Sequence, residues 1–583
     1  MMKYPLEEKS KGFLTVLVFV LLGWAVYAHV VAGEFVADDY PTIVSNLTVR
    51  NLGDLAALWR SFPTRFLVML SFALNYHVHQ LDVAGYHLVN IWIHVINALL
   101  VYVFVRLTFT TPGLRAHPLK RRARAIGFYA GLIFLVHPIQ TQAVSYIMQR
   151  GTSLACLFYL TTLIFYIRAR TERKFLYFPA AWATMLLGLL TKEQIVTLPA
   201  TLLTYEIFFL SDVRKHWKTI SRDIAPFVFL SGLLVFIFTQ ERSGSIFGLK
   251  SQLFGHGFSW PYFLTEINVL RTYLRLMILP VHQCHHYAYP LAQSFFEPGT
   301  LWSVFLLICL FASAVFLFFR RRLLSFAVIW FFITTSVEFI VVCFVNRGVL
   351  YEHWIYLAMV GFVIFLTVAL ATLIPSRGLF KGVMVLLVVV LSVSTYVRNF
   401  VWQTEIGFWE DVVKKTPDSP LVYLGSGTAY HRKGMIAHAL AHYQKGLFLF
   451  FSRPRHLDGT DRIYLSRIYN NLGLVYQRVG RVTEAVRSYQ RAYKINPRNA
   501  SAYHNLAKIC IDLKKYRQAI VFLKEELRIN PGDPDVYYGL GLAFLRLNEK
   551  EKAKTFFEKT RQLETKYGNQ PKADRLMELK QKL

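Results

Sequence analysis

Two adjacent acidic residues, Asp38 and Asp39, follow the first long apolar run of the sequence. One carboxylate of such a pair could accept the proton of a hydroxyl group, while its neighbour binds a substrate group or raises its partner's pKa. A solvated acidic turn or a helix cap would use the same residue types. A metal site is a third reading, and no further ligand set accompanies the pair.

Several basic residues stand where outer loops or the outer ends of membrane spans are expected. Guanidinium groups bind phosphate in a bidentate way, so these residues could hold an anionic lipid phosphate. Snorkelling toward the membrane interface is the alternative. The pair Lys192-Glu193 lies between two apolar runs with almost no loop, so it needs mutual compensation or a ligand. The basic candidates are Arg65, Arg150, Lys192, Arg271, Arg275 and Arg347.

Three histidines, His282, His285 and His286, form a third cluster. Their spacing could supply metal ligands, but no Asp or Glu is adjacent, and an aromatic surface loop explains them equally well. The five cysteines form no CxxC pair and no regular spacing, so they indicate neither a zinc site nor a disulfide framework.

The composition places these residues in a membrane protein. Of 583 residues, 54% are hydrophobic and only 17% are charged, against about 25% charged in a typical soluble domain. This excludes a disordered chain, a disulfide scaffold and a simple soluble enzyme. Residues 1–400 form the hydrophobic part, and the charged residues are denser in 401–583.

Eleven apolar segments are long enough to be expected as membrane spans, each needing about 20 residues. With the N-terminus in the cytoplasm, five clusters of Arg and Lys fall on the cytoplasmic side, in agreement with the positive-inside rule. The loops 32–86 and 240–300, and the C-terminal part, then face away from the cytoplasm. A polar helix over Phe263–Leu279 is expected at the outer surface or buried against protein. The expected spans are 13–31, 87–109, 125–145, 151–168, 175–191, 194–210, 224–239, 301–319, 323–343, 354–374 and 382–397.

A 34-residue period runs through the C-terminal part. Asn471-Leu472-Gly473 returns as Asn505 and Ala507, and again as Gly539 and Gly541. Small residues at this period are typical of tetratricopeptide repeats, whose stacked helix pairs form a superhelix with a concave binding face. We expect a peptide or protein ligand there, and a packing spacer is the alternative. The predicted repeats are 420–453, 466–499, 500–533 and 534–567.

The ordered set of motifs resembles the transmembrane-and-tetratricopeptide protein O-mannosyltransferases and their bacterial relatives over nearly the whole chain. It begins with Asp38-Asp39 and ends with the repeats. This chain departs from the pattern at Gln142, where the family commonly has Glu. The intervening motifs are His137-Pro138-Ile139-Gln140-Thr141-Gln142, Gln149-Arg150, Thr191-Lys192-Glu193-Gln194, Tyr351-Glu352-His353 and Arg398-Asn399.

The resemblance implies an all-α protein: a GT-C glycosyltransferase body of about 11 transmembrane helices (1–400), followed by a repeat solenoid (401–583). It implies transfer of a sugar from a polyprenyl-phosphate donor to Ser/Thr hydroxyls of a secreted or envelope protein. Asp38 is the first choice as base and Asp39 the second. Donor phosphate ligands are Arg65, Arg150, Lys192 and Arg347; further pocket candidates are His137, Glu193, Arg271, Arg275, Glu352 and His353.

The expected partners are the donor lipid, an acceptor polypeptide at the repeats and membrane lipids, without nucleic acid. No cofactor is assigned, although a divalent cation is possible. The predicted location is a bacterial inner membrane with periplasmic repeats; an endoplasmic reticulum membrane with lumenal repeats is the alternative. A non-enzymatic membrane-anchored repeat scaffold is the rival function, and a transporter or lipid flippase is a second rival.

Overall fold

The structure is a computed structural model that describes residues 6–210, 213–240, 257–345, 348–452 and 459–566. Within these residues the chain forms helices and connecting segments without a strand, so the all-α prediction is confirmed. The chain divides into two compact units, Met1–Thr404 and Glu405–Leu583.

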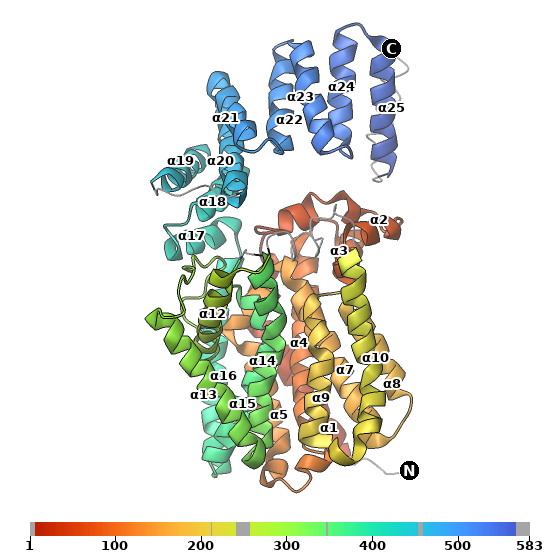
Figure 1. Ribbon diagram of the computed structural model, residues 1–583, viewed down its shortest axis with the longest axis vertical. Helices are drawn as coiled ribbons and strands as arrows, with labels where there is room; N and C mark the ends of the chain where they lie inside the picture. Colours follow the sequence, from red (N-terminus) through yellow and green to blue (C-terminus); the bar gives the residue numbers. More distant parts are fainter. Residues whose placement is uncertain (1–5, 211–212, 241–256, 346–347, 453–458, 567–583) are drawn as a thin grey trace. The chain divides into compact units, whose positions relative to one another are not determined.

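The first unit is a bundle of long helices that run side by side, with α2 and α3 at one end (Figure 1). Its core is built where α4 packs against α5 and α7, and where α14 packs against α15. The helices are α1 (Leu6–Tyr27), α2 (Leu55–Ser61), α3 (Phe66–His79), α4 (Val83–Thr108), α5 (Ala123–Val136), α6 (Thr141–Val144), α7 (Arg150–Glu172), α8 (Tyr177–Leu189), α9 (Leu198–Tyr205), α10 (Val213–Gln240), α12 (Trp260–Ile278), α13 (Pro298–Arg320), α14 (Arg322–Val345), α15 (Ala358–Leu373) and α16 (Arg377–Asn399).

Six helical segments of the described chain are long and apolar enough to cross a membrane, and each coincides with an expected span. Two further expected spans are apolar but shorter helices, Tyr177–Leu189 and Ala358–Leu373. The expected span 125–145 is interrupted after Val136, because Pro138 lacks a backbone N–H and restricts the residue before it. The six segments are Gly12–Ala32, Val83–Thr108, Ile147–Glu172, Pro298–Arg320, Arg322–Val345 and Arg377–Trp402.

The two remaining expected spans are 194–210 and 224–239. Segment 194–210 starts as a 3₁₀ helix, η9 (Glu193–Thr197), continues as α9 and ends in a π turn at Glu206–Leu210. Segment 224–239 lies inside α10, which is not among the six helical segments that are long and apolar enough to cross a membrane. The helix expected over Phe263–Leu279 is α12, and Glu266 and Asn268 are buried in it. Packing against α13 and α14 allows α12 to carry these polar side chains.

Buried polar side chains on α4 hold the interrupted segment in place. Asn90 donates to the carbonyl oxygen of Val144 at 3.1 Å, and Asn97 donates to that of Ser153 at 2.8 Å. The ring nitrogens of His94 lie 3.0 Å from the carbonyl oxygen of Leu135 and 2.7 Å from the hydroxyl of Tyr356. The carbonyl groups of Leu135 and Val144, near the ends of α5 and α6, are thereby paired inside protein, as an apolar environment requires.

The second unit consists of consecutive helix pairs after an initial helix, α17 (Glu405–Lys415). Small residues let the paired helices approach: a Cβ added at Gly473 would lie 2.5 Å from the Tyr489 ring, and one at Gly541 would lie 2.6 Å from Phe557. The pairs are α18 (Pro420–Arg432) with α19 (Ile436–Phe451), α20 (Gly459–Arg478) with α21 (Val482–Ile495), α22 (Ala500–Asp512) with α23 (Tyr516–Ile529), and α24 (Pro534–Arg546) with α25 (Lys550–Lys566).

Candidate functional site

The acidic pair lies in a turn whose two carboxylates have different surroundings. Asp39 is fully buried, and its oxygens accept hydrogen bonds from the backbone N–H of Val36 at 3.0 Å and of Met148 at 2.8 Å. Asp38 is exposed, and its backbone N–H donates to the Tyr146 hydroxyl at 3.0 Å. Ala37 has a positive φ of 46°, which costs a non-glycine residue about 1–3 kcal/mol. Asp39 therefore anchors the turn, and Asp38 is the carboxylate that a substrate can reach.

Burial raises the pKa of Asp39 to about 8, although the Val36 and Met148 N–H groups oppose the shift. A folded-state pKa above the ordinary value means that the folded protein retains a proton that the unfolded chain loses. The stability that Asp39 contributes is complete below about pH 4 and is lost as pH rises through about 8.

We expect the apparent melting temperature of the wild type to fall relative to that of Asp39→Asn between pH 5 and 9. The difference should grow steadily from pH 5 to about 8 and level off above it, because between these values the folded wild type holds a proton that the unfolded chain has already released, and the asparagine variant has no such proton. Thermal unfolding of both purified proteins over this range checks the prediction. Parallel pH profiles for the two proteins would contradict it.

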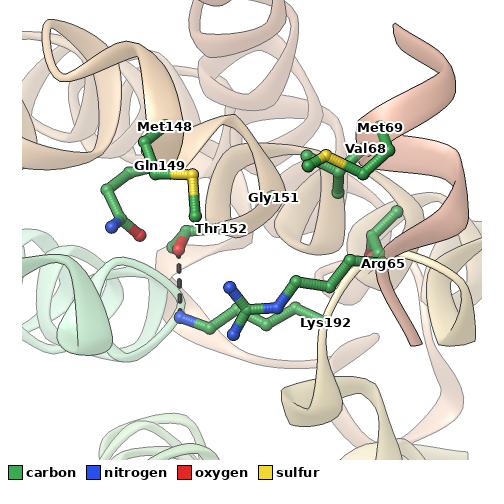
Figure 2. Close-up of a pocket in the computed structure, with 9 residues that line it drawn as sticks. Arg65, Val68, Met69, Met148, Gln149, Gly151, Thr152 and Lys192 are labelled. Atoms are coloured by element: carbon green, nitrogen blue, oxygen red, sulfur yellow. Dashed lines mark hydrogen bonds between the residues drawn. The ribbon is translucent and has the colours of Figure 1, made fainter. Parts of the chain in front are cut away.

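A pocket beside the acidic turn contains two basic side chains, Arg65 and Lys192. Lys192 is buried, and its Nζ donates to the Thr152 hydroxyl at 3.0 Å. Figure 2 shows both cationic side chains extending into the pocket, with Thr152 and Gln149 at its other side. Two converging cations form a suitable site for a phosphate group.

Glu193 balances part of this positive charge. Its carboxylate lies 3.7 Å from the Arg65 guanidinium. Burial alone would raise the pKa of Glu193, but the charges of Arg65 and Lys192 outweigh it and hold the pKa below its usual value. The ion pair is partly exposed, so an incoming phosphate can compete for Arg65.

Residues 146–149 connect the acidic turn to the basic pocket. Tyr146 and the Met148 backbone bind the Asp38–Asp39 turn, whereas the Met148 and Gln149 side chains line the pocket. The segment thus fixes a potential base and a potential phosphate site on one local framework. Tyr146 and Met148 were not predicted as site residues, because their role depends on contacts made more than 100 positions away in the sequence.

Arg150, which the sequence predicted as a phosphate ligand, is bonded instead to groups inside the protein. Its guanidinium is fully buried and donates to the Asn90 side chain at 2.7 Å, to Asn75 at 2.6 Å and to the Tyr86 carbonyl oxygen at 3.0 Å. Further bonds go to Ser71, and the Phe72 ring lies 4.5 Å from the guanidinium carbon. Each guanidinium nitrogen already donates to a protein acceptor and the group is fully buried, so Arg150 is not retained among the proposed donor ligands.

Replacing Arg150 with Met should lower the free energy of unfolding by about 3–5 kcal/mol, because several buried acceptors lose their donor together. Thermal unfolding in detergent measures this effect. The matched control is Arg115→Met, which removes an exposed arginine and should leave the melting temperature unchanged. Normal stability of Arg150→Met together with weakened donor binding would contradict the structural assignment.

Gln142 connects three segments at the same end of the bundle. Its Oε1 accepts a hydrogen bond from the His353 backbone at 2.7 Å and lies 3.1 Å from the His353 ring. Its Nε2 lies 3.3 Å from the His285 ring nitrogen, where an amide can donate a hydrogen bond and an ionised glutamate could not. Burial, followed by the charges of Lys192, His285 and Arg65, lowers the pKa of His353 well below its usual range, so its ring is neutral.

Glu352 fastens the histidine-containing loop. Its carboxylate accepts from the Cys284 backbone at 2.7 Å, from the Tyr287 hydroxyl at 2.6 Å and from Gln283 at 3.0 Å. Within the described residues, no group of three or more His, Cys, Asp or Glu could hold a metal ion. His285 packs instead edge-on against the rings of Tyr146 and Trp402.

The remaining predicted residues occupy less central positions. His137 caps the 3₁₀ helix at Pro138–Gln140 and bonds the Met277 carbonyl oxygen at 3.0 Å. Arg275 is exposed and donates to the Val281 carbonyl oxygen. Arg271 is half-buried on α12, with its Nε unpaired. Arg347 lies outside the described residues.

The repeat unit carries a second candidate surface, a chain of amide side chains across three consecutive first helices. Asn505 on α22 donates to Asn470 on α20 at 3.1 Å, and Asn470 donates to Asn471 at 3.3 Å. Asn471 in turn donates to the Thr428 hydroxyl on α18 at 3.1 Å. We call these four residues the amide ladder. Asn470 is buried, whereas Asn471 and Asn505 are half-buried, and half-buried amides offer both donors and acceptors to a bound main chain.

Comparison with known proteins confirms the predicted resemblance. Tetratricopeptide-repeat families match residues 464–531 and 534–559. The protein O-mannosyl-transferase F38B6.6 of Caenorhabditis elegans is 25% identical over 76% of this chain and 64% of its own length. Human protein O-mannosyl-transferase TMTC1 is 24% identical over 75% of this chain and 55% of its own length. The chain thus spans 55–64% of the length of these two curated relatives.

Proposed function

We propose that the chain is a membrane glycosyltransferase of the GT-C type that transfers a sugar, with mannose the first candidate, from polyprenyl phosphate to Ser/Thr hydroxyls of proteins. The observation that carries this proposal is an exposed carboxylate and a two-cation pocket held by one short segment, residues 146–149. Similarity to protein O-mannosyl-transferases over three quarters of the chain supports it. We further propose that the site faces away from the cytoplasm, in a bacterial inner membrane.

The proposed reaction is a single displacement. The Asp38 carboxylate accepts the hydroxyl proton as the Ser/Thr oxygen attacks the anomeric carbon of the donor sugar. A new carbon–oxygen bond forms there while the bond to the phosphate oxygen breaks, which inverts the anomeric configuration. Arg65 and Lys192 stabilise the charge that develops on the departing polyprenyl phosphate. Asp39 positions the base and does not itself take the proton.

Disruption of the gene in its native host tests the function directly. Intact masses of secreted and envelope proteins should show loss of a hexose from at least one protein, and a plasmid copy should restore it. A plasmid copy with Asp38→Asn should not. If no protein changes in mass while envelope assembly fails, the chain acts as a membrane-anchored scaffold.

We propose that the amide ladder holds the acceptor polypeptide by its main chain, so the double variant Asn471→Ala/Asn505→Ala should act through acceptor binding. For a long unstructured Ser/Thr peptide we expect kcat/KM to fall about tenfold, mainly through KM. Transfer to a tripeptide acceptor should stay near wild type. Lys524→Ala, an exposed change on a second helix, is the matched control. An unchanged KM for the long peptide would refute this role.

A further inference from the structure

A group of buried acceptor oxygens without hydrogen-bond partners lies next to Lys192. Both carboxylate oxygens of Glu338 on α14 lack a donor at normal hydrogen-bond distance, the Gln194 amide being their neighbour, and Oε1 of Glu266 on α12 also lacks a donor. Oε1 of Gln194 in η9 is unpaired as well. All three side chains are at least nine-tenths buried, with exposed fractions of 6%, 2% and 0%. An unpaired buried polar group costs about 1–3 kcal/mol, so four in one region call for a ligand.

Packing brings the three side chains together. η9 and α12 both pack against α14. Glu338 lies within electrostatic range of Lys192, Glu193 and Glu266, and its carboxylate is close to the Gln194 amide. The Gln194 Nε2 donates to the Trp354 carbonyl oxygen at 2.9 Å, which directs Oε1 away from that contact. We call Glu338, Glu266 and Gln194 the acceptor cluster.

Aromatic side chains stand beside the acceptor cluster. The Tyr273 hydroxyl lies within electrostatic range of Glu266 and Glu338, and it donates a hydrogen bond to the Tyr351 carbonyl oxygen at 3.1 Å. The rings of Tyr351 and Trp354 are 5.0 Å apart, and both residues are only partly buried. Buried acceptors beside half-exposed aromatic rings match the alternating hydroxyls and apolar faces of a sugar ring.

A metal ion fits the acceptor cluster less well. Lys192 already places a positive charge within range of Glu338, which opposes a second cation. Across the described parts of the chain, no set of three His, Cys, Asp or Glu is arranged to hold a metal. Neutral hydroxyl donors satisfy the unpaired oxygens without adding charge.

We propose that the acceptor cluster binds the sugar of the donor through hydrogen bonds donated by its hydroxyls, while Arg65 and Lys192 bind the phosphate. This inference rests on the proposed function. Lys192 belongs to the phosphate pocket and also faces Glu338, so the two subsites meet at that side chain. The cluster therefore distinguishes a glycosylated lipid from the bare lipid phosphate that is the product.

Binding to the purified full-length chain tests this, with undecaprenyl phosphate and undecaprenyl-phosphate-mannose as probes and tryptophan fluorescence as readout. Glu338→Gln should weaken binding of the mannosyl lipid at least about tenfold, because amide N–H groups replace an acceptor. Binding of undecaprenyl phosphate should not weaken, since its proposed cationic ligands, Arg65 and Lys192, remain in place. Glu172→Gln, an exposed change on α7, should affect neither lipid.

Equal effects on both lipids, or none on either, would overturn the proposal, as would a mannosyl preference that EDTA abolishes. If Glu338→Gln does not fold, Glu266→Gln makes the same test at an oxygen farther from the phosphate ligands. Binding is measured without turnover, so the outcomes separate. A mannosyl preference that depends on Glu338 without any sugar transfer refutes the proposed function alone; transfer with an unaltered preference refutes only the acceptor cluster.

Discussion

Asp38→Asn is expected to lower the rate of sugar transfer at least about 100-fold, the usual contribution of a general base. Asparagine keeps the size of the side chain and the backbone hydrogen bond to Tyr146 but cannot accept the hydroxyl proton. Donor and acceptor KM should change little, because Asp38 acts mainly in the transition state. Initial rates with undecaprenyl-phosphate-mannose and a Ser/Thr peptide measure the loss.

Asp82→Asn is the matched control for this variant. Asp82 is also exposed on the same expected outer loop, and it accepts a hydrogen bond from the Ala84 backbone as the cap of α4. Asparagine caps a helix as well as aspartate does, so activity should be retained.

Asp39→Asn should lower activity together with stability, because it loses one of two anchoring bonds. Full activity of Asp38→Asn would remove the base assignment.

Arg65→Gln and Lys192→Gln are expected to raise the KM for the donor lipid by about 10- to 100-fold, since each removes a charge-assisted bond to phosphate. Lys192→Gln should also lower kcat, because the leaving phosphate gains charge in the transition state. Titration of undecaprenyl phosphate against each variant separates binding from chemistry. Arg65→Lys should recover only part of the affinity, since an ammonium group cannot bind phosphate in a bidentate way.

Arg60→Gln is the control for the pocket variants. It removes an exposed arginine from α2, five positions before Arg65, and donor KM should stay at the wild-type value. Donor affinity that is unchanged in both Arg65→Gln and Lys192→Gln is inconsistent with a phosphate site in this pocket.

The repeat array was predictable because its signal is local and periodic. Small residues recur every 34 positions where paired helices cross, and tetratricopeptide families match 464–531 and 534–559. Asn471 and Asn505 also stand 34 positions apart. The ladder itself was not predicted, because it requires Asn470 to bridge two neighbouring helices.

The bundle was predictable as a class but less so in its details. Apolar length identified the long helices, and Pro138 was a visible reason to break the expected span 125–145. The different roles of Asp38 and Asp39 were not readable, since they depend on an N–H group at Met148. Arg150 was interpreted as a ligand for the same reason: its acceptors on Asn75 and Asn90 lie 75 and 60 positions away.

Glu338 and Glu266 were not predicted as site residues, for a related reason. A single acidic residue inside an apolar run carries no information about which other side chains share its surroundings. Packing of η9, α12 and α14 creates the acceptor cluster, and only the complete fold shows that its oxygens are unpaired.

The most direct test of the central claim uses the purified wild-type chain in lipid nanodiscs, with undecaprenyl-phosphate-mannose and an unstructured Ser/Thr peptide. Intact mass spectrometry of the peptide, with site localisation, is the measurement. We predict one added hexose on a Ser or Thr oxygen and an equal amount of undecaprenyl phosphate released. A peptide of unchanged mass, while both donor and peptide demonstrably bind, would contradict the account.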